Sequence, residues 1–84
     1  MKITLKLFAM LQDYLPEEAR GQRALELALP EGSTVASVVE QFHLPEKLVH
    51  LTLVNGEYVE REARASHRLH DGDVLAIWPP VAGG

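Results

Sequence analysis

Hydrophobic and polar residues alternate at the start of the chain, as is typical of a strand with one buried face. Residues 2–8 divide into an apolar side and a largely polar side: Ile3, Leu5 and Leu7 against Lys2, Thr4, Lys6 and Phe8. The alternation recurs at 25–29, with Leu25, Leu27 and Leu29 inward. We therefore predict that these two strands pair as a hairpin with a long, partly helical connection.

The spacing of apolar residues predicts one short and one principal helix. In the segment 9–15 the residues at helical spacing are Met10, Leu11, Tyr14 and Leu15, and Pro16 ends this short helix. The principal helix begins after Thr34, which together with Ser33 can cap free N–H groups. Apolar residues recur along one face of this helix to about residue 42: Val35, Val38, Val39 and Phe42.

Asn55-Gly56 is the best local signal in the chain, because a two-residue type I′ turn needs positive φ at both positions. The turn predicts a hairpin in which Leu53 pairs with Tyr58. A polar stretch over 60–68 follows, with Leu69 as an apolar plug and a turn in which Gly72 supplies positive φ. The last strand is predicted over residues 74–78.

Two hairpins that flank a helix, followed by a final strand, predict an α+β fold with one principal helix packed across one face of a mixed sheet of four to five strands. If the last strand pairs in parallel beside the first, the result is the β-grasp arrangement of ubiquitin-like proteins. We expect a folded domain over residues 1–78 and an extended, flexible C-terminal tail over 79–84.

Composition narrows the functional class. The 84 residues, 46% hydrophobic and 24% charged, fit one small globular domain, and the absence of cysteine excludes disulfides, thiolate metal sites and a cysteine nucleophile. The absence of cysteine also fits a cytoplasmic protein. A net charge of −4 argues against a nucleic-acid partner. No run approaches the roughly 20 apolar residues that span a membrane, and the opening MKITLKLFAML is interpreted as structural rather than as a secretory signal.

The ending IWPPVAGG has the chemistry of a chain that presents its own terminus. Pro79 and Pro80 stiffen the exit from the last strand, so residues 79–84 can reach about 20 Å at ~3.3 Å each. Gly83 and Gly84 lack a Cβ, so a narrow tunnel can grip their backbone. The terminal carboxylate is a poor electrophile and needs activation, for which transfer of an adenylyl group from ATP is suited.

The end DGDVLAIWPPVAGG, the LFA at 7–9 and the capped helix after Thr34 together resemble the ThiS/MoaD family of ubiquitin-like sulfur carriers. The resemblance spans nearly the whole chain, and its ending is the specific part. Thiamine-type members usually lack the two prolines, so Pro79 and Pro80 favour the molybdopterin branch, whose members form the small subunit of molybdopterin synthase.

This resemblance implies that an activating enzyme uses ATP to adenylate Gly84, and that a sulfur donor such as a cysteine desulfurase or rhodanese-type protein converts it to a thiocarboxylate. In molybdopterin synthase the tail enters the large subunit and gives sulfur to cyclic pyranopterin monophosphate. Here the threading residues are Pro79, Pro80, Val81, Ala82 and Gly83. We thus expect a carrier with no catalytic residues and no bound cofactor of its own.

Phe8 and Trp78 are predicted to flank the base of the tail on the sheet face away from the helix. Large aromatic residues on a polar face suggest a partner-docking patch. The alternative is a local core covered by the 60–68 loop. Family members carry aromatic residues at both positions, although Trp78 stands where Phe is more usual.

Other functions stay open at this stage. A carrier for thiamine, tRNA thiolation or another pathway has the same chemistry, a ubiquitin-like modifier passes Gly84 to a lysine, and an interaction module leaves the glycines inert. A cluster near the last turn resembles a metal site but is interpreted as solvated turn residues, so we predict no metal: His67, His70, Asp71 and Asp73.

Overall fold

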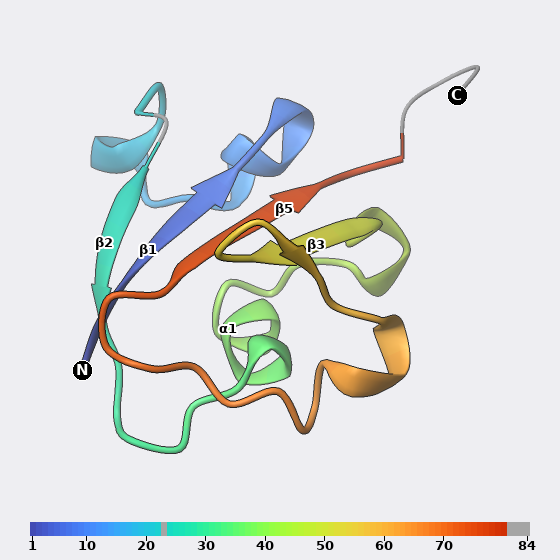
Figure 1. Cartoon of the computed structure of the whole chain (residues 1–84). Coiled ribbons are helices and arrows are strands. Elements are labelled where there is room, and N and C mark those ends of the chain that lie inside the picture. Colours follow the sequence, from blue (N-terminus) through green and yellow to red (C-terminus); the bar gives the residue numbers. More distant parts are fainter. Residues whose placement is uncertain (23, 81–84) are drawn as a thin grey trace.

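The computed structural model describes residues 1–22 and 24–80, where a five-stranded mixed sheet has helix α1 across one face (Figure 1). The strands are β1 (Lys2–Leu7), β2 (Leu25–Ala28), β3 (Leu51–Val54), β4 (Glu57–Tyr58) and β5 (Val74–Trp78), and the helix is α1 (Val35–Gln41). Short 3₁₀ helices lie in the connections: η1 (Ala9–Tyr14), η2 (Glu17–Ala19), η3 (Glu46–Leu48) and η4 (Arg61–Ala63).

The last strand lies in the middle of the sheet, whose strand order is β2-β1-β5-β3-β4. It pairs in parallel with β1 and antiparallel with β3. The β1–β2 and β3–β4 pairs are both antiparallel, as hairpins must be. The predicted ubiquitin-like β-grasp fold is therefore confirmed, and the last strand has the bounds that the sequence predicted.

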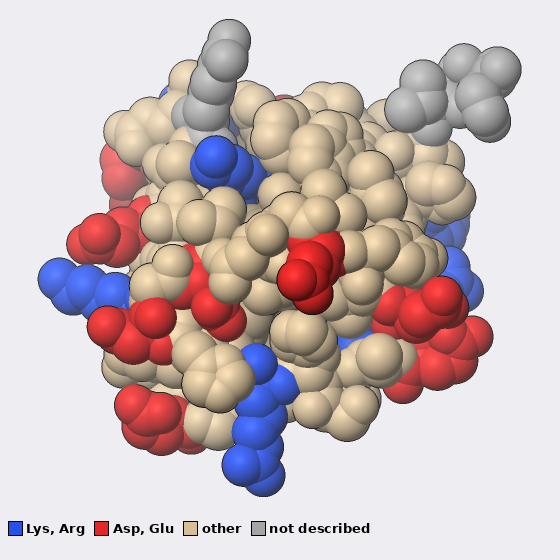
Figure 2. Space-filling view, viewed as in Figure 1, with Lys and Arg blue, Asp and Glu red and all other residues tan. Residues whose placement is uncertain are grey.

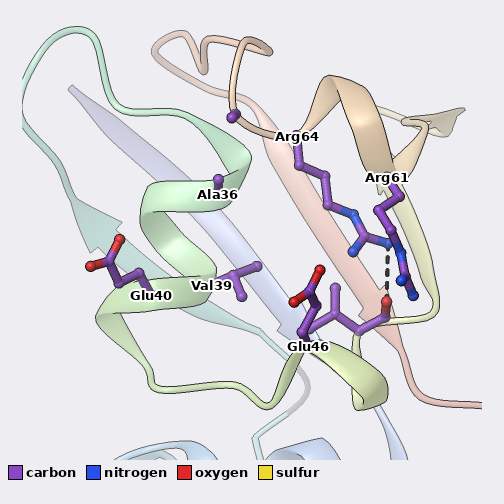
Figure 3. Close-up of a pocket in the computed structure, with 8 residues that line it drawn as sticks. Ala36, Val39, Glu40, Glu46, Arg61 and Arg64 are labelled. Atoms are coloured by element: carbon purple, nitrogen blue, oxygen red, sulfur yellow. Dashed lines mark hydrogen bonds between the residues drawn. The ribbon is translucent and has the colours of Figure 1, made fainter.

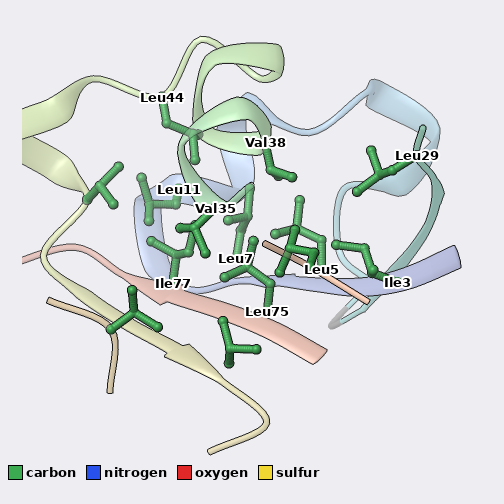
Figure 4. Close-up of a cluster of buried hydrophobic side chains, with 14 of the residues drawn as sticks. Ile3, Leu5, Leu7, Leu11, Leu29, Val35, Val38, Leu44, Leu75 and Ile77 are labelled. Atoms are coloured by element: carbon green, nitrogen blue, oxygen red, sulfur yellow. The ribbon is translucent and has the colours of Figure 1, made fainter. Parts of the chain in front are cut away.

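The core lies between α1 and the sheet face that the alternation in β1 predicted to be buried (Figure 4). Fully buried side chains come from β1, β5, α1 and η1: Ile3, Leu5, Leu7, Leu75, Ile77, Val35, Val38 and Leu11. Burial of one such side chain stabilises the fold by roughly 1.5–3 kcal/mol relative to leaving it exposed. In both β1 and β5 every second side chain is buried in this core. The intervening side chains of each strand must therefore face the opposite side of the sheet.

The connection after β1 departs from the predicted helix. Residues 9–14 form the 3₁₀ helix η1, which buries Leu11, but Met10 is 55% exposed. At three residues per turn Leu11 and Tyr14 share one face, which packs on the core, and Met10 lies about 120° away from it. Ala9, the first residue of η1, adopts φ +53, which turns the chain sharply at the end of β1.

The N-terminus of α1 begins at the predicted cap. The Thr34 hydroxyl accepts from the Ser37 N–H at 3.1 Å, and the Ser37 hydroxyl accepts from the Thr34 N–H at 2.8 Å. The two amides before Ser37 donate to the 60–68 loop, Val35 to the His67 carbonyl and Ala36 to the Arg64 carbonyl. The free N–H groups of the first turn are thus satisfied, and the loop is attached to the helix side of the sheet.

The C-terminus of α1 is closed by a Schellman motif. The His43 N–H donates to Glu40 O at 3.0 Å, and the Leu44 N–H donates to Val39 O at 3.0 Å. This pattern requires a left-handed residue after the cap, and His43 adopts it with φ +55 although it carries a Cβ.

The hairpin after β3 has the predicted register, with Leu53 opposite Tyr58 and positive φ at Asn55 and Gly56. The Asn55 side chain also joins this hairpin to the start of β5. Its Oδ1 accepts from the Val74 N–H, and its Nδ2 donates to the Asp73 carboxylate, each at 2.9 Å. Gly72 has φ +88, as the predicted turn requires. Leu69 is buried, as expected of a plug.

Candidate functional site

The base of the tail is hydrogen bonded to the chain on both flanks of β5, within the plane of the sheet. On the β1 side, the Phe8 N–H donates to the Ile77 carbonyl at 3.2 Å. On the β3 side, the His50 N–H donates to the Trp78 carbonyl at 3.0 Å. The next two residues are prolines, which have no N–H to continue either ladder. The point at which the chain leaves the sheet is therefore fixed at Trp78.

Only the first part of the predicted tail falls within the described residues. Pro79 is buried and Pro80 is exposed. The remaining predicted residues, Val81, Ala82, Gly83 and Gly84, lie outside the described residues, and their predicted roles stay predictions.

Phe8 and Trp78 lie together at this base. Their rings are stacked with centroids 4.2 Å apart and an interplanar angle of 3°, and each side chain is half-buried. Stacking removes one face of each ring from water. The structure thus brings together the two residues that the sequence predicted to flank the tail; their role in docking stays a prediction.

Further apolar residues share this face, although the sequence pattern did not single them out. Opposite residues of antiparallel strands point to the same face, and Leu51 lies opposite Trp78 while Leu53 lies opposite Ala76. Tyr58, opposite Leu53, is 56% exposed. We call this set the open-face patch: Phe8, Leu51, Leu53, Tyr58, Ala76 and Trp78.

The 60–68 loop does not cover the stacked aromatic pair, which corrects the alternative of a local core beneath it. The carbonyls of Arg64 and His67 in this loop accept hydrogen bonds from the first turn of α1, on the opposite side of the sheet. Figure 2 shows acidic side chains mainly along two opposite margins of the view, with mostly uncharged surface near the end of β5. The open-face patch is thus an apolar surface beside the tail.

Asp73 forms several hydrogen bonds in the turn that leads into β5. Burial alone would raise the pKa of this carboxyl, but hydrogen bonds from the His70 N–H and Asn55 Nδ2, together with the nearby His70 and His67 side chains, lower the pKa below its ordinary value of 3.8. Across residues 1–22 and 24–80, no three or more His, Cys, Asp or Glu side chains are grouped as metal ligands.

In that same part of the chain, no helix has the length and apolar character needed to cross a membrane.

A pocket of about 310 Å³ lies on the helix side, between α1, η3 and η4 (Figure 3). Glu40 and Glu46 line it together with Arg61 and Arg64. Among the described residues, none of these four forms an ion pair within 4.0 Å. Arg64 donates instead to the carbonyls of Val49 and His50, at 3.0 and 3.3 Å. Arg64 was not predicted as a site residue, because it lies within a stretch whose sequence is typical of an exposed polar loop.

Known proteins share both the sequence pattern and the fold. The ThiS family model matches residues 5–84. A protein from Pyrococcus furiosus, described as putative molybdopterin converting factor subunit 1, is 27% identical with a TM-score of 0.68, over 96% of this chain and 99% of that one. SAMP1 from Haloferax volcanii, a small archaeal modifier protein, is 26% identical with a TM-score of 0.67, and the match covers all of both chains.

A further solved structure shares the fold at 18% identity. It is the complex of subunits 1 and 2 of the molybdopterin-converting factor from Helicobacter pylori, with a TM-score of 0.60 over the whole of both chains. No curated protein matches this chain.

Proposed function

Because this chain belongs to the ThiS family of ubiquitin-like sulfur carriers and modifiers, we propose that it carries sulfur as a thiocarboxylate on Gly84 and is the small subunit of a molybdopterin synthase. The observation that carries the proposal is the base of the tail. Two neighbouring hydrogen bonds fix the Ile77 and Trp78 carbonyls, and two prolines follow before the Gly83-Gly84 end. A stiff exit from the sheet at this point supports presentation of the Gly84 carboxylate to a partner.

The chemistry requires a partner, since the described residues offer no phosphate-binding loop. In the proposed reaction a Gly84 carboxylate oxygen attacks the α-phosphate of ATP, and pyrophosphate leaves. The acyl adenylate then loses AMP to the terminal sulfur of a donor persulfide, so that a C–S bond replaces the C–O bond to AMP. A second thiol, as the reductant, cleaves the S–S bond of this acyl disulfide, which leaves the thiocarboxylate on Gly84 and a disulfide on the donor side. Delivery of that sulfur to a pterin precursor, with water replacing it at the carbonyl, restores the carboxylate. The carrier supplies the terminus, and the partners supply the catalytic groups.

Two observations favour the molybdopterin branch within this chemistry. The ending carries the Pro79-Pro80 pair that distinguishes this branch by resemblance. The relative from Pyrococcus furiosus, similar over nearly the full chain, is described as a subunit of a molybdopterin converting factor. We propose that the open-face patch docks the activating enzyme and the large subunit, because it lies beside the exit of the tail.

The proposal is tested by intact mass after co-expression with the cognate activating enzyme and a sulfur donor. Replacement of one oxygen by sulfur, absent in a variant that lacks Gly84, supports the carrier. Transfer to a purified large subunit with cyclic pyranopterin monophosphate, and formation of the dithiolene, tests the pathway. An unchanged mass with an activating enzyme that releases pyrophosphate from ATP in the presence of this chain overturns the sulfur-carrier function.

A protein modifier is the second candidate, and one observation favours it. The match to SAMP1 covers all of both chains, and that protein is described as a modifier. In this case a lysine amine attacks the adenylate, and an isopeptide bond forms as AMP leaves. Higher-mass conjugates whose tryptic peptides carry residues 69–84 of this chain on a lysine would identify this function, because the last trypsin site of the chain follows Arg68, and loss of Gly84 abolishes them.

A further inference from the structure

One peptide group joins a buried arginine to the base of the tail. The Val49 carbonyl accepts from the Arg64 guanidinium at 3.0 Å, and the N–H of the same peptide, which belongs to His50, donates to the Trp78 carbonyl at 3.0 Å. The same Nη2 atom of Arg64 also donates to the His50 carbonyl at 3.3 Å. A continuous chain of hydrogen bonds thus runs from Arg64, whose bond to Val49 is drawn in Figure 3, to the last residue of β5.

Arg64 is an unusual residue in this place, because it is only 7% exposed. Arginine is rarely buried without a paired charge, and burial of a cation is costly. Burial lowers the pKa of Arg64, and the neighbouring Arg61 lowers it further. Within the described part of the chain, no carboxylate lies within 4.0 Å of it. What the buried guanidinium contacts is the backbone of residues 49 and 50.

A charged donor strengthens the bond next to it. A guanidinium that donates to a carbonyl polarises that peptide, and the N–H of the polarised peptide becomes a better donor. Here the better donor is the N–H of His50, the residue directly before β3, and it makes the last hydrogen bond on this side of β5 before Pro79. The Trp78 carbonyl is attached to the nitrogen of Pro79, so the orientation of this peptide sets the direction in which the chain leaves the sheet.

We infer that Arg64 is a positioning residue, which aims the tail through the Val49–His50 peptide without touching the tail's reacting atoms. The inference rests on the proposed function for its consequence, namely efficient activation of Gly84. The hydrogen-bond chain itself is measurable on the isolated protein. The alternative is that Arg64 only attaches the 60–68 loop to the core. In that case its loss would lower global stability, and amide exchange would rise equally at His50 and Phe8.

The experiment compares Arg64→Met, Arg64→Lys and the matched control Arg61→Met. Arg61 lines the same pocket and carries the same charge, but it forms no side-chain hydrogen bond within the described residues. Amide hydrogen exchange by NMR reports the His50 N–H relative to the Phe8 N–H, which holds the other side of the tail base. Steady-state adenylation of each variant, followed by pyrophosphate release, gives kcat and KM for the carrier.

In Arg64→Met we expect His50 exchange to rise severalfold relative to Phe8, because the polarisation that strengthens the His50 N–H bond to Trp78 is lost. We expect kcat to fall severalfold with KM little changed, because the docking surface is intact and the tail is misaimed. Arg64→Lys restores part of both effects, since an ammonium can still donate, and Arg61→Met has neither effect.

Equal exchange at His50 and Phe8 in Arg64→Met overturns the inference, and so does an unchanged kcat when His50 exchange rises. If Arg64→Met does not fold, Arg64→Lys provides the same comparison with a smaller change. If the wild-type chain is never adenylated, the proposed function fails and with it the role of Arg64 in activation. The His50 exchange then still decides whether Arg64 holds the base of the tail.

Discussion

The ring of Phe8 lies parallel to the indole of Trp78, with 4.2 Å between their centroids, at the point where β5 ends. Trp78 ends β5, and Phe8 directly follows β1, which runs parallel to β5. The backbone of each residue is hydrogen bonded across the sheet, through the Phe8 N–H and the Trp78 carbonyl. This contact joins the apolar open face to the base of the tail. A partner that docks on the patch therefore contacts a surface whose position is coupled to the tail.

We predict that Trp78→Ala weakens binding to the activating enzyme and to the large subunit by at least about 2 kcal/mol, the effect of losing an interfacial aromatic anchor. Trp78→Phe retains a ring that can stack on Phe8, so it should bind within a few-fold of wild type. Isothermal titration calorimetry measures both affinities. Lys47→Ala, on exposed η3, is the surface control. Equal affinities for Trp78→Ala and wild type would remove the open-face patch from the docking surface.

Thr52→Val should stabilise the fold by about 1 kcal/mol, because Thr52 is fully buried and its hydroxyl has no hydrogen-bond partner among the described residues. Valine has nearly the same shape and carries no polar atom to satisfy. Chemical denaturation gives the free energy of unfolding. The matched variant Thr34→Val should have the opposite sign, since it removes the cap of α1. A loss of stability in Thr52→Val contradicts this prediction.

His43→Gly should raise the free energy of unfolding by about 0.5–1 kcal/mol. His43 has φ +55 in the Schellman motif, a conformation that costs a residue with a Cβ roughly 1–2 kcal/mol. Part of this gain is offset because glycine loses more chain entropy on folding. Gly72→Ala is the reciprocal test, because Gly72 has φ +88 and a Cβ added there would meet no atom within 4 Å, so that only backbone strain changes. Thermal denaturation should show a higher Tm for the first variant and a lower Tm for the second.

The pKa of Asp73 predicts how stability depends on pH. Its folded-state pKa lies below the ordinary value of 3.8, so the carboxylate stabilises the fold above that value, and this contribution is lost as pH falls through the folded-state pKa. The difference in unfolding free energy between wild type and Asp73→Asn should therefore be constant near neutral pH and shrink below about pH 4. Asp13→Asn, at an exposed position, is the control. A difference that grows on acidification would mean that the folded-state pKa is raised instead.

Local patterns in the sequence predicted much of the fold. The alternation in β1, the Thr34 cap and the Asn55-Gly56 turn each depend on a few adjacent residues, and each is observed. The position of β5 beside β1 was predicted by combining these elements with the β-grasp arrangement, in which the last strand pairs in parallel with the first. The wrong placement of Met10 arose because apolar spacing does not distinguish a 3₁₀ turn from an α-helix.

The open-face patch was only partly predictable, because it depends on the register between β3 and β5. In Leu51–Val54, polarity alone favours Leu51 and Leu53 inside and Thr52 outside. The structure has the opposite orientation, since Thr52 lies opposite Ile77 on the core face. Long-range pairing with a strongly apolar strand overrode the local preference. Arg64 was not found for a similar reason: its burial results from tertiary packing of a loop that is polar in sequence.

The central place of β5 has a mechanical consequence. A pull on the tail acts along the strand axis, whereas the hydrogen bonds to β1 and β3 run across it. Such a load is applied in shear, so several bonds on both sides must break together before the strand can slide. A strand at the sheet edge would be held by a single ladder. If a partner draws on the terminus as we propose, the sheet should therefore keep its hydrogen bonds under that load.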